Sequence, residues 1–305
     1  MKNLRNHQIQ SGWVQITNSG LEETELAAHT HTLHMGATAE TIWEVPAYLP
    51  YVQPPLSAVA IAAAEEKIGH QLPPEYLSLL RTQNGGYIRY SLPRNPHEKI
   101  YGIGPHDTSL TDFDWEIAQQ SVDFPLKGLV PFDGAVHWFL CLDYRRNAGG
   151  PTVTYVEIDC NEESPVATSF PDYLSRLQIK VRDDDFILEG ASGIENVKSV
   201  LSSALGVVFE PPDLLTYGYP AHRGRLGEDY LWLNANRVPR GFVRPEDEGF
   251  EELKGSMPGE ALQFAEAPSD AYVLYVTESI KNQVLRAFVQ SQIVVRPLRD
   301  YFKSC

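Results

Sequence analysis

The chain has 305 residues, 43% of them hydrophobic, which is enough for one large or two ordinary domains with packed cores and excludes disorder as the main state. Its formal net charge of −15 and its pI near 5.0 argue against nucleic acid as a partner, because phosphate binding depends on clustered lysine and arginine. Both halves carry more acidic than basic residues, and this balance permits a basic protein as a partner.

We expect neither a membrane-spanning helix nor a signal peptide. No run approaches the roughly 18 to 20 apolar residues that a membrane helix needs, and no apolar segment follows the charged opening residues. Cys141, Cys160 and Cys305 form an odd set without C-x-x-C spacing, which fits a reducing compartment. We therefore expect a cytoplasmic protein without a cofactor. No pattern indicates its oligomeric state.

The chain opens with a polar segment. Residues 1–37 predict an irregular surface extension, and the proline-rich stretch 45–55 excludes a helix there. Apolar residues then recur at helical spacing over residues 56–68, and Gly69 supplies a stop. A second helix is predicted to start at the prolines of residues 73–74 and to end at the Asn-Gly-Gly of residues 84–86.

Short β-branched or aromatic runs separated by turn formers predict an antiparallel meander next. The expected strands cover residues 87–90, 100–104, 129–134, 137–144 and 152–159. A closing helix should begin after Ser169, which is placed as an N-cap, with Asp172 in the first turn.

The charged run at residues 182–185 predicts a solvated hinge between two domains. A first α+β domain would cover residues 38–182, and a second, smaller α+β domain residues 186–305. In the second domain we expect helices near residues 194–205 and 279–290. Strands are expected near residues 186–190, 206–210, 229–234, 261–267, 271–277 and 292–298.

Four segments in order resemble the SUKH superfamily, which includes a yeast cell-wall-synthesis regulator and many bacterial immunity proteins. They are LPPEYLSLLRTQNGGYI (72–88), IYGIGP (100–105), LVPFDGAVHWFLCLDY (129–144) and VATSFPDYLSRL (166–177). The resemblance covers residues 38–180. It implies helices packed on a mostly antiparallel sheet. It also implies an immunity protein that neutralises a toxin domain, often a nuclease, of a polymorphic toxin system. The last 120 or so residues show no such resemblance.

An acidic inhibitor suits a basic nuclease, because opposite charge speeds association and carboxylates can cover a phosphate-binding site. The expected contact segment interleaves acids with an aromatic anchor and comprises Asp107, Asp112, Asp114, Trp115 and Glu116. The alternative is an ordinary solvated loop with Trp115 in the core.

Strand alternation places Tyr87 and Arg89 on one side, so we add both to the predicted partner-binding set. A packed edge strand explains these two residues equally well.

Three histidines suggest a different function. His29, His31 and His34 lie within six residues, and two of them would share a strand face, so a zinc-dependent hydrolase is one alternative. The set has no recognised partner motif such as H-E-x-x-H. A regulatory scaffold is another alternative.

Other chemical patterns are weaker still. Cys141 lies in an apolar run, where a thiol behaves as a small buried hydrophobe, and the G-x-G of residues 102–104 is not followed by a helix. His137 beside Asp133 is assigned to strand packing. We predict no catalytic residue. A basic cluster in the second half could bind an acidic ligand or contact the first domain; it comprises Arg223, Arg225, Arg237, Arg240 and Arg244.

Overall fold

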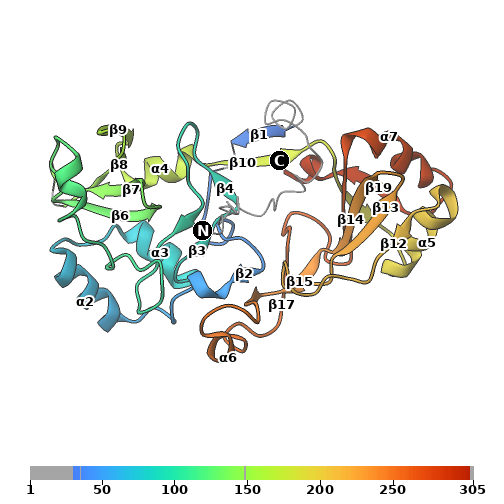
Figure 1. Cartoon of the computed structure of the whole chain (residues 1–305), viewed down its shortest axis with the longest axis horizontal. Coiled ribbons are helices and arrows are strands. Elements are labelled where there is room, and N and C mark those ends of the chain that lie inside the picture. Colours follow the sequence, from blue (N-terminus) through green and yellow to red (C-terminus); the bar gives the residue numbers. More distant parts are fainter. Residues whose placement is uncertain (1–29, 35, 148, 303–305) are drawn as a thin grey trace, which may run out of the picture.

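The computed structural model describes residues 30–34, 36–147 and 149–302 of the chain. Figure 1 shows the two halves of the chain side by side, with β10 (Gln178–Arg182) running from one half toward the other. Helices are mixed with mainly antiparallel sheets, which confirms the predicted α+β class. No helix within the described ranges is both long and apolar enough to cross a bilayer.

The two predicted helices of the first half are present. Helix α2 (Ala58–Ile68) starts at Ser57, whose hydroxyl accepts the N–H of Ala60, and ends at Gly69, which is in the left-handed region with φ 76°. Helix α3 (Pro74–Thr82) starts with proline and buries four apolar residues, Tyr76, Leu77, Leu79 and Leu80.

The Asn-Gly-Gly turn is where the chain reverses after α3. Gly85 and Gly86 have φ of 90° and 127°, which side chains rarely tolerate. The buried side chain of Asn84 donates to the carbonyl of Pro54 and exchanges two hydrogen bonds with the backbone of Ile103. The turn therefore fixes two loops and has a structural role.

A four-stranded antiparallel sheet follows, in the order β6-β7-β8-β9. Its strands are β6 (Leu129–Gly134), β7 (Trp138–Asp143), β8 (Thr152–Glu157) and β9 (Glu162–Ala167). Helix α4 (Phe170–Arg176) begins at the predicted cap, where the hydroxyl of Ser169 accepts the N–H of Asp172. Phe132 and Phe170 pack edge to face with centroids 5.8 Å apart, so the helix closes one side of the sheet.

The predicted strand at residues 87–90 is two short strands in different sheets. β3 (Gly86–Tyr87) pairs with β5 (Lys99–Ile100), whereas β4 (Tyr90–Ser91) pairs with β10. Between the two strands, the N–H of Ile88 donates to the carbonyl of Glu98 and the N–H of Arg89 donates to the carbonyl of Ile42. Because these acceptors lie on different segments, the chain bends here.

The segment expected to be an irregular extension contains a strand. β1 (Thr30–His34) pairs antiparallel with β10 along five residues, although the sequence predicts neither strand. Buried Ile179 and Val181 alternate with polar residues along β10, and this alternation was hidden because the strand follows α4 without a turn.

The prediction of a solvated hinge at residues 182–185 is wrong. Asp184 and Asp185 are only 2% and 1% exposed, and Arg182 pairs with Asp184 at this junction. Burial raises the pKa of the Asp185 carboxyl well above its ordinary value, with the Asp184 carboxylate adding to the effect. The junction is a buried crossing between sheets.

The second half contains a six-stranded antiparallel sheet in the order β12-β13-β14-β18-β11-β19. Helices α5 (Ile194–Leu205) and α7 (Glu278–Ala287) pack on it around Leu201 and Val284. The strands are β11 (Asp185–Glu189), β12 (Val208–Phe209), β13 (His222–Leu226), β14 (Asp229–Ala235), β18 (Tyr272–Val276) and β19 (Val294–Pro297). Of these, β13 has no counterpart among the predicted strands.

Small elements complete the second half and its connection to the first. The strands are β15 (Arg237–Pro239), β16 (Gly241–Phe242) and β17 (Glu260–Leu262), and the short helices are α6 (Phe250–Leu253) and η4 (Leu298–Phe302). In the first half, η2 (Leu49–Tyr51) and η3 (Ala118–Ser121) are single 3-10 turns.

The two halves share a core. β16 pairs in parallel with β2 (Ala47–Tyr48), and one apolar cluster runs from the first half into buried Phe264, Leu298 and Phe302 of the second. Separating the two halves would expose the apolar surface that they bury against each other, and exposing such surface to water costs roughly 25 cal/mol per Å².

Candidate functional site

The predicted partner-binding residues fall into two separate groups. Tyr87 and Arg89 face the second half of the chain and border a pocket between the halves, whereas Trp115 borders a different hollow next to the end of α2 and the start of β6. The predicted partner-binding set is therefore divided between two places on the molecule.

Arg89 is engaged within the chain. Its guanidinium makes two parallel hydrogen bonds of 3.2 Å to the carboxylate of Glu266, and it lies over the rings of Phe264 and Phe302, with centroid distances of 5.7 and 5.5 Å. The side chain is only 11% exposed. Arg89 therefore joins the two halves and is not presented to a partner.

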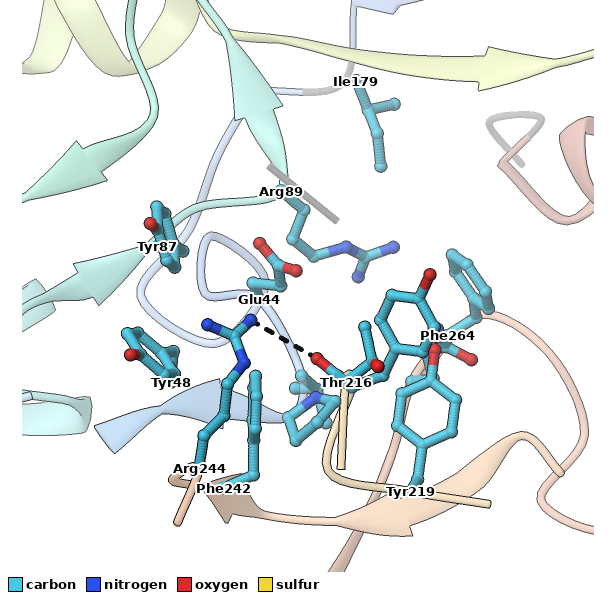
Figure 2. A pocket seen from close by; sticks show the side chains of 14 residues that line it. Glu44, Tyr48, Tyr87, Arg89, Ile179, Thr216, Tyr219, Phe242, Arg244 and Phe264 are labelled. Atoms are coloured by element: carbon cyan, nitrogen blue, oxygen red, sulfur yellow. Dashed lines mark hydrogen bonds between the residues drawn. The ribbon is translucent and has the colours of Figure 1, made fainter. Parts of the chain in front are cut away.

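The pocket between the halves has aromatic walls. Figure 2 shows rings from both halves around it, and the carboxylate of Glu44 pointing between the guanidinium groups of Arg89 and Arg244. Arg244 lies 5.0 Å from the ring centroid of Tyr48 and donates to the carbonyl of Thr216 at 3.4 Å. The phenol of Tyr48 donates to Asp247, and burial together with that carboxylate raises the pKa of the phenol well above its ordinary value.

Size limits what this pocket can do. Its volume is about 70 Å³, whereas ligand sites typically span roughly 300 to 1,000 Å³. A water molecule takes about 30 Å³, so the space suits solvent or a very small group. Tyr87, which is only 8% exposed, forms part of this packed junction.

The acidic segment is exposed, but its tryptophan is turned inward. The indole N–H of Trp115 donates to the carbonyl of Leu129 at 3.0 Å, and its ring packs edge to face on Phe139 at 5.0 Å. The acids that flank it are solvent-exposed: Asp107, Asp112, Asp114 and Glu116. The carboxylate of Asp114 accepts the N–H of Glu116, which shapes the turn into η3.

A hollow of about 330 Å³ lies next to this segment. Its lining includes Phe113, Trp115, Ile68 and Leu129, with Lys67 and Lys127 also contributing. An apolar floor with lysine side chains at its wall suits an apolar group better than a cation.

Asp133 and His97 form a buried polar network. The Oδ2 atom of Asp133 lies 2.7 Å from Nδ1 of His97, and Nε2 of His97 lies 2.5 Å from the hydroxyl of Tyr173. Asp133 also accepts the N–H groups of Glu98 and Lys99. The side chains of His97 and Asp133 are 0% exposed, so this Asp-His-Tyr arrangement has no contact with solvent and fixes the loop before β5.

Glu98 beside this network has a perturbed acidity. Burial raises the pKa of its carboxyl to about 7, the Asp133 carboxylate adds to the rise, and Lys99 partly offsets it. His137, which the sequence places near Asp133, instead pairs with Asp159 at 2.8 Å on the surface.

The histidine cluster is only partly described. Nε2 of His31 lies 2.7 Å from Asp183 and 2.8 Å from the guanidinium of Arg299. His29 lies outside the described residues, and of His34 only the backbone is described. Within the described ranges, no group of three or more His, Cys, Asp or Glu side chains is arranged to hold a metal ion.

Two of the second-half arginines pair within that half. Arg223 bonds Glu210 at 2.7 Å, and Arg237 lies 4.0 Å from Glu260. Arg244 reaches Tyr48 of the first half, as described above. Cys141 is buried, as the sequence predicts, and burial raises the pKa of its thiol well above its ordinary value.

Sequence reasoning missed the structural pairs whose members lie far apart along the chain. Glu266 is 177 positions from Arg89, and His97 is 36 positions from Asp133. No local pattern marks such pairs. Of these four residues only Arg89 and Asp133 stand beside an aromatic residue in the sequence, so the sequence carries no shared signal for the two pairs.

The family comparison gives one match. Residues 55–176 match the model of the SMI1 / KNR4 family (SUKH-1), which spans α2 to the end of α4. The match begins later than the resemblance at residues 38–180. A search of curated proteins finds none that matches the chain. The first half of this chain therefore carries a SUKH domain of the SMI1 / KNR4 type.

Proposed function

We propose that this protein is a non-enzymatic immunity protein whose SUKH domain binds and neutralises a basic toxin domain, such as a nuclease of a polymorphic toxin system. The observation that carries the proposal is the SUKH-1 match over residues 55–176. SUKH proteins commonly act by binding other proteins, and the resemblance described above includes many immunity proteins.

Charge supports the same partner. The net charge is −15, and the acids of the predicted contact segment reach solvent. A toxin that grips phosphate backbones is basic, so an acidic inhibitor is steered to it and can cover its active site with carboxylates. Association of this kind weakens steeply as salt rises.

Binding without turnover is part of the proposal. The buried His97–Asp133 pair has the groups of a general acid–base relay, but a substrate cannot reach side chains that are 0% exposed. The pocket between the halves is too small for most substrates, at about 70 Å³.

The test is rescue from toxicity. Basic C-terminal toxin domains from the genome that encodes this chain are expressed singly in bacteria, with or without the full chain. We expect growth to be restored against one toxin domain and against few or no others. Each catalytically inactive toxin domain is the control for expression load. If the full chain restores growth against none of the toxin domains, the proposal is overturned.

A regulatory scaffold is the second candidate, favoured by the half of the chain outside the match. There Leu214 and Leu215 are 56% and 58% exposed on a turn whose N–H groups are held by Asp213. Such a scaffold would retain several partners weakly and would rescue no toxin. A zinc-dependent hydrolase built on His29, His31 and His34 is the third, and it requires stoichiometric zinc in metal analysis of the purified full chain.

A further inference from the structure

We infer that the partner docks on one end of the four-stranded sheet, where exposed acids and two exposed aliphatic side chains lie on segments that are bonded together. We call this surface the acidic end. It is formed by residues 111–124, by the β6–β7 loop at residues 135–137, and by the β8–β9 turn at residues 157–162. The inference rests on the proposed function and names its contact surface.

Hydrogen bonds join the three segments. Asp123 and Asn161 exchange two hydrogen bonds of 2.8 Å, one through the backbone N–H of Asp123 and one through the amide of Asn161. The N–H of Ile158 donates to the carbonyl of His137 at 2.7 Å, and His137 also pairs with Asp159. The β8–β9 turn therefore holds the other two segments in place.

A small core supports this surface. Val122, Leu126, Val156 and Ile158 are buried together, and Trp115 packs against them while its N–H is bonded to Leu129. A surface held by its own core loses little conformational entropy on binding, and such preorganisation favours affinity.

The aliphatic groups are unusually open. Ile117 at the start of η3 is 81% exposed, and Val136 in the β6–β7 loop is 82% exposed. Single exposed aliphatic residues are common on proteins. Here both stand on segments joined to the same turn. The hollow of about 330 Å³ borders the first of these segments at Thr111, Phe113 and Trp115, and its other walls include the start of β6.

Charge selects the occupant. The exposed acids of the acidic end are Asp112, Asp114, Glu116, Asp123, Asp159 and Glu162. Interfaces of this type bury an apolar centre within a charged rim. The surface therefore fits a basic protein domain that offers an apolar patch within a ring of lysine or arginine.

The probe is the toxin domain that the full chain neutralises in the rescue experiment. Its association with purified full-length variants is measured by surface kinetics at low and physiological salt. Asp112→Lys with Glu116→Lys tests charge, and Ile117→Ser with Val136→Ser tests the aliphatic contacts. Thr111→Trp fills the hollow.

We expect the charge variant to weaken binding about 100-fold or more, mainly through a slower on-rate. The aliphatic variant should weaken it about tenfold or more, mainly through a faster off-rate. Thr111→Trp should also weaken it about tenfold, by excluding a partner side chain from the hollow.

Matched controls lie in the second half. Glu246→Lys with Glu248→Lys changes net charge equally, and Leu214→Ser with Leu215→Ser removes another exposed aliphatic pair, whose members are 56% and 58% exposed. Both should bind within about twofold of the unchanged chain, and unfolding curves verify that every variant is folded.

The outcomes separate the two proposals. If no toxin domain is neutralised, the proposed function fails and this surface assignment fails with it. If a toxin domain is neutralised but the charge and aliphatic variants bind it like the unchanged chain, only the acidic end is overturned. Loss of binding in the Leu214 and Leu215 variant alone would move the contact to the second half.

Discussion

The Nδ1 atom of His97 lies 2.7 Å from the Oδ2 atom of Asp133, where neither side chain reaches solvent. Removing one partner of such a pair leaves the other buried without its counterpart, which is costly. We expect Asp133→Ala to lower the free energy of unfolding by about 3 to 5 kcal/mol, measured by urea denaturation. Asp159→Ala, which breaks the exposed pair with His137, is the control and should cost less than about 0.5 kcal/mol. Equal losses of stability in the two variants would show that the buried pair stabilises the fold no more than the exposed pair does.

The contact between Arg89 and Glu266 should stabilise the junction of the two halves. A double-mutant cycle with Arg89→Ala and Glu266→Ala is expected to give a coupling energy of about 1 to 2 kcal/mol, because the pair is bidentate and mostly buried. The same cycle on Arg237 and Glu260, whose charged atoms lie 4.0 Å apart on the surface, should give about zero. A coupling energy near zero for both pairs would contradict this role of Arg89.

The carboxyl of Glu98 predicts a pH dependence of stability. Its pKa is about 7 in the folded chain, against an ordinary value of 4.5, so the folded state holds the proton more tightly. The contribution to stability is complete below pH 4.5 and is lost as the pH rises through 7. Glu98→Gln should therefore raise the free energy of unfolding at pH 8 by about 1 kcal/mol relative to its effect at pH 4.5. The full shift is discounted because the carboxyl keeps some contact with water. Unfolding curves from pH 4 to 8 measure this, and parallel profiles for the two proteins would refute it.

Gly102 should not tolerate a side chain. A Cβ at this position would lie 2.3 Å from the backbone oxygen of Asn84 and 2.6 Å from Cγ of Gln53. Gly102→Ala should lower the free energy of unfolding by about 2 to 4 kcal/mol, because a backbone oxygen in a fixed turn cannot move aside. Gly255→Ala, where nothing lies within 4 Å, should change stability by less than about 0.5 kcal/mol. Comparable thermal midpoints for the two variants would contradict the close approach.

Helices with local signals were predictable from the sequence. Helix ends are marked by Ser57, Ser169 and Gly69, which act through hydrogen bonds or backbone conformation within a few residues. A short stretch of sequence is therefore enough to predict them. The strands that were missed had no such signal. β9 carries Pro165 and exposed acids, because it is the outer strand of its sheet, and β13 contains Gly224 within a basic run.

The surroundings of the proposed contact residues were predictable only in part. The acids at Asp112, Asp114 and Glu116 are exposed because charged side chains stay in water. The orientation of Trp115 depends on Leu129 and Phe139, and the surroundings of Arg89 depend on residues of the other half. Such tertiary contacts leave no periodic trace in a single sequence.

The pairing of β1 with β10 bears on how the protein should be handled. Trimming residues 1–37 as a dispensable tail would uncover the N–H and C=O groups of β10 along the five positions that β1 now bonds. A bare edge of that kind recruits strands from other molecules. Truncated proteins that lack residues 1–37 would then self-associate, and an affinity measured for any partner would be that of the aggregates.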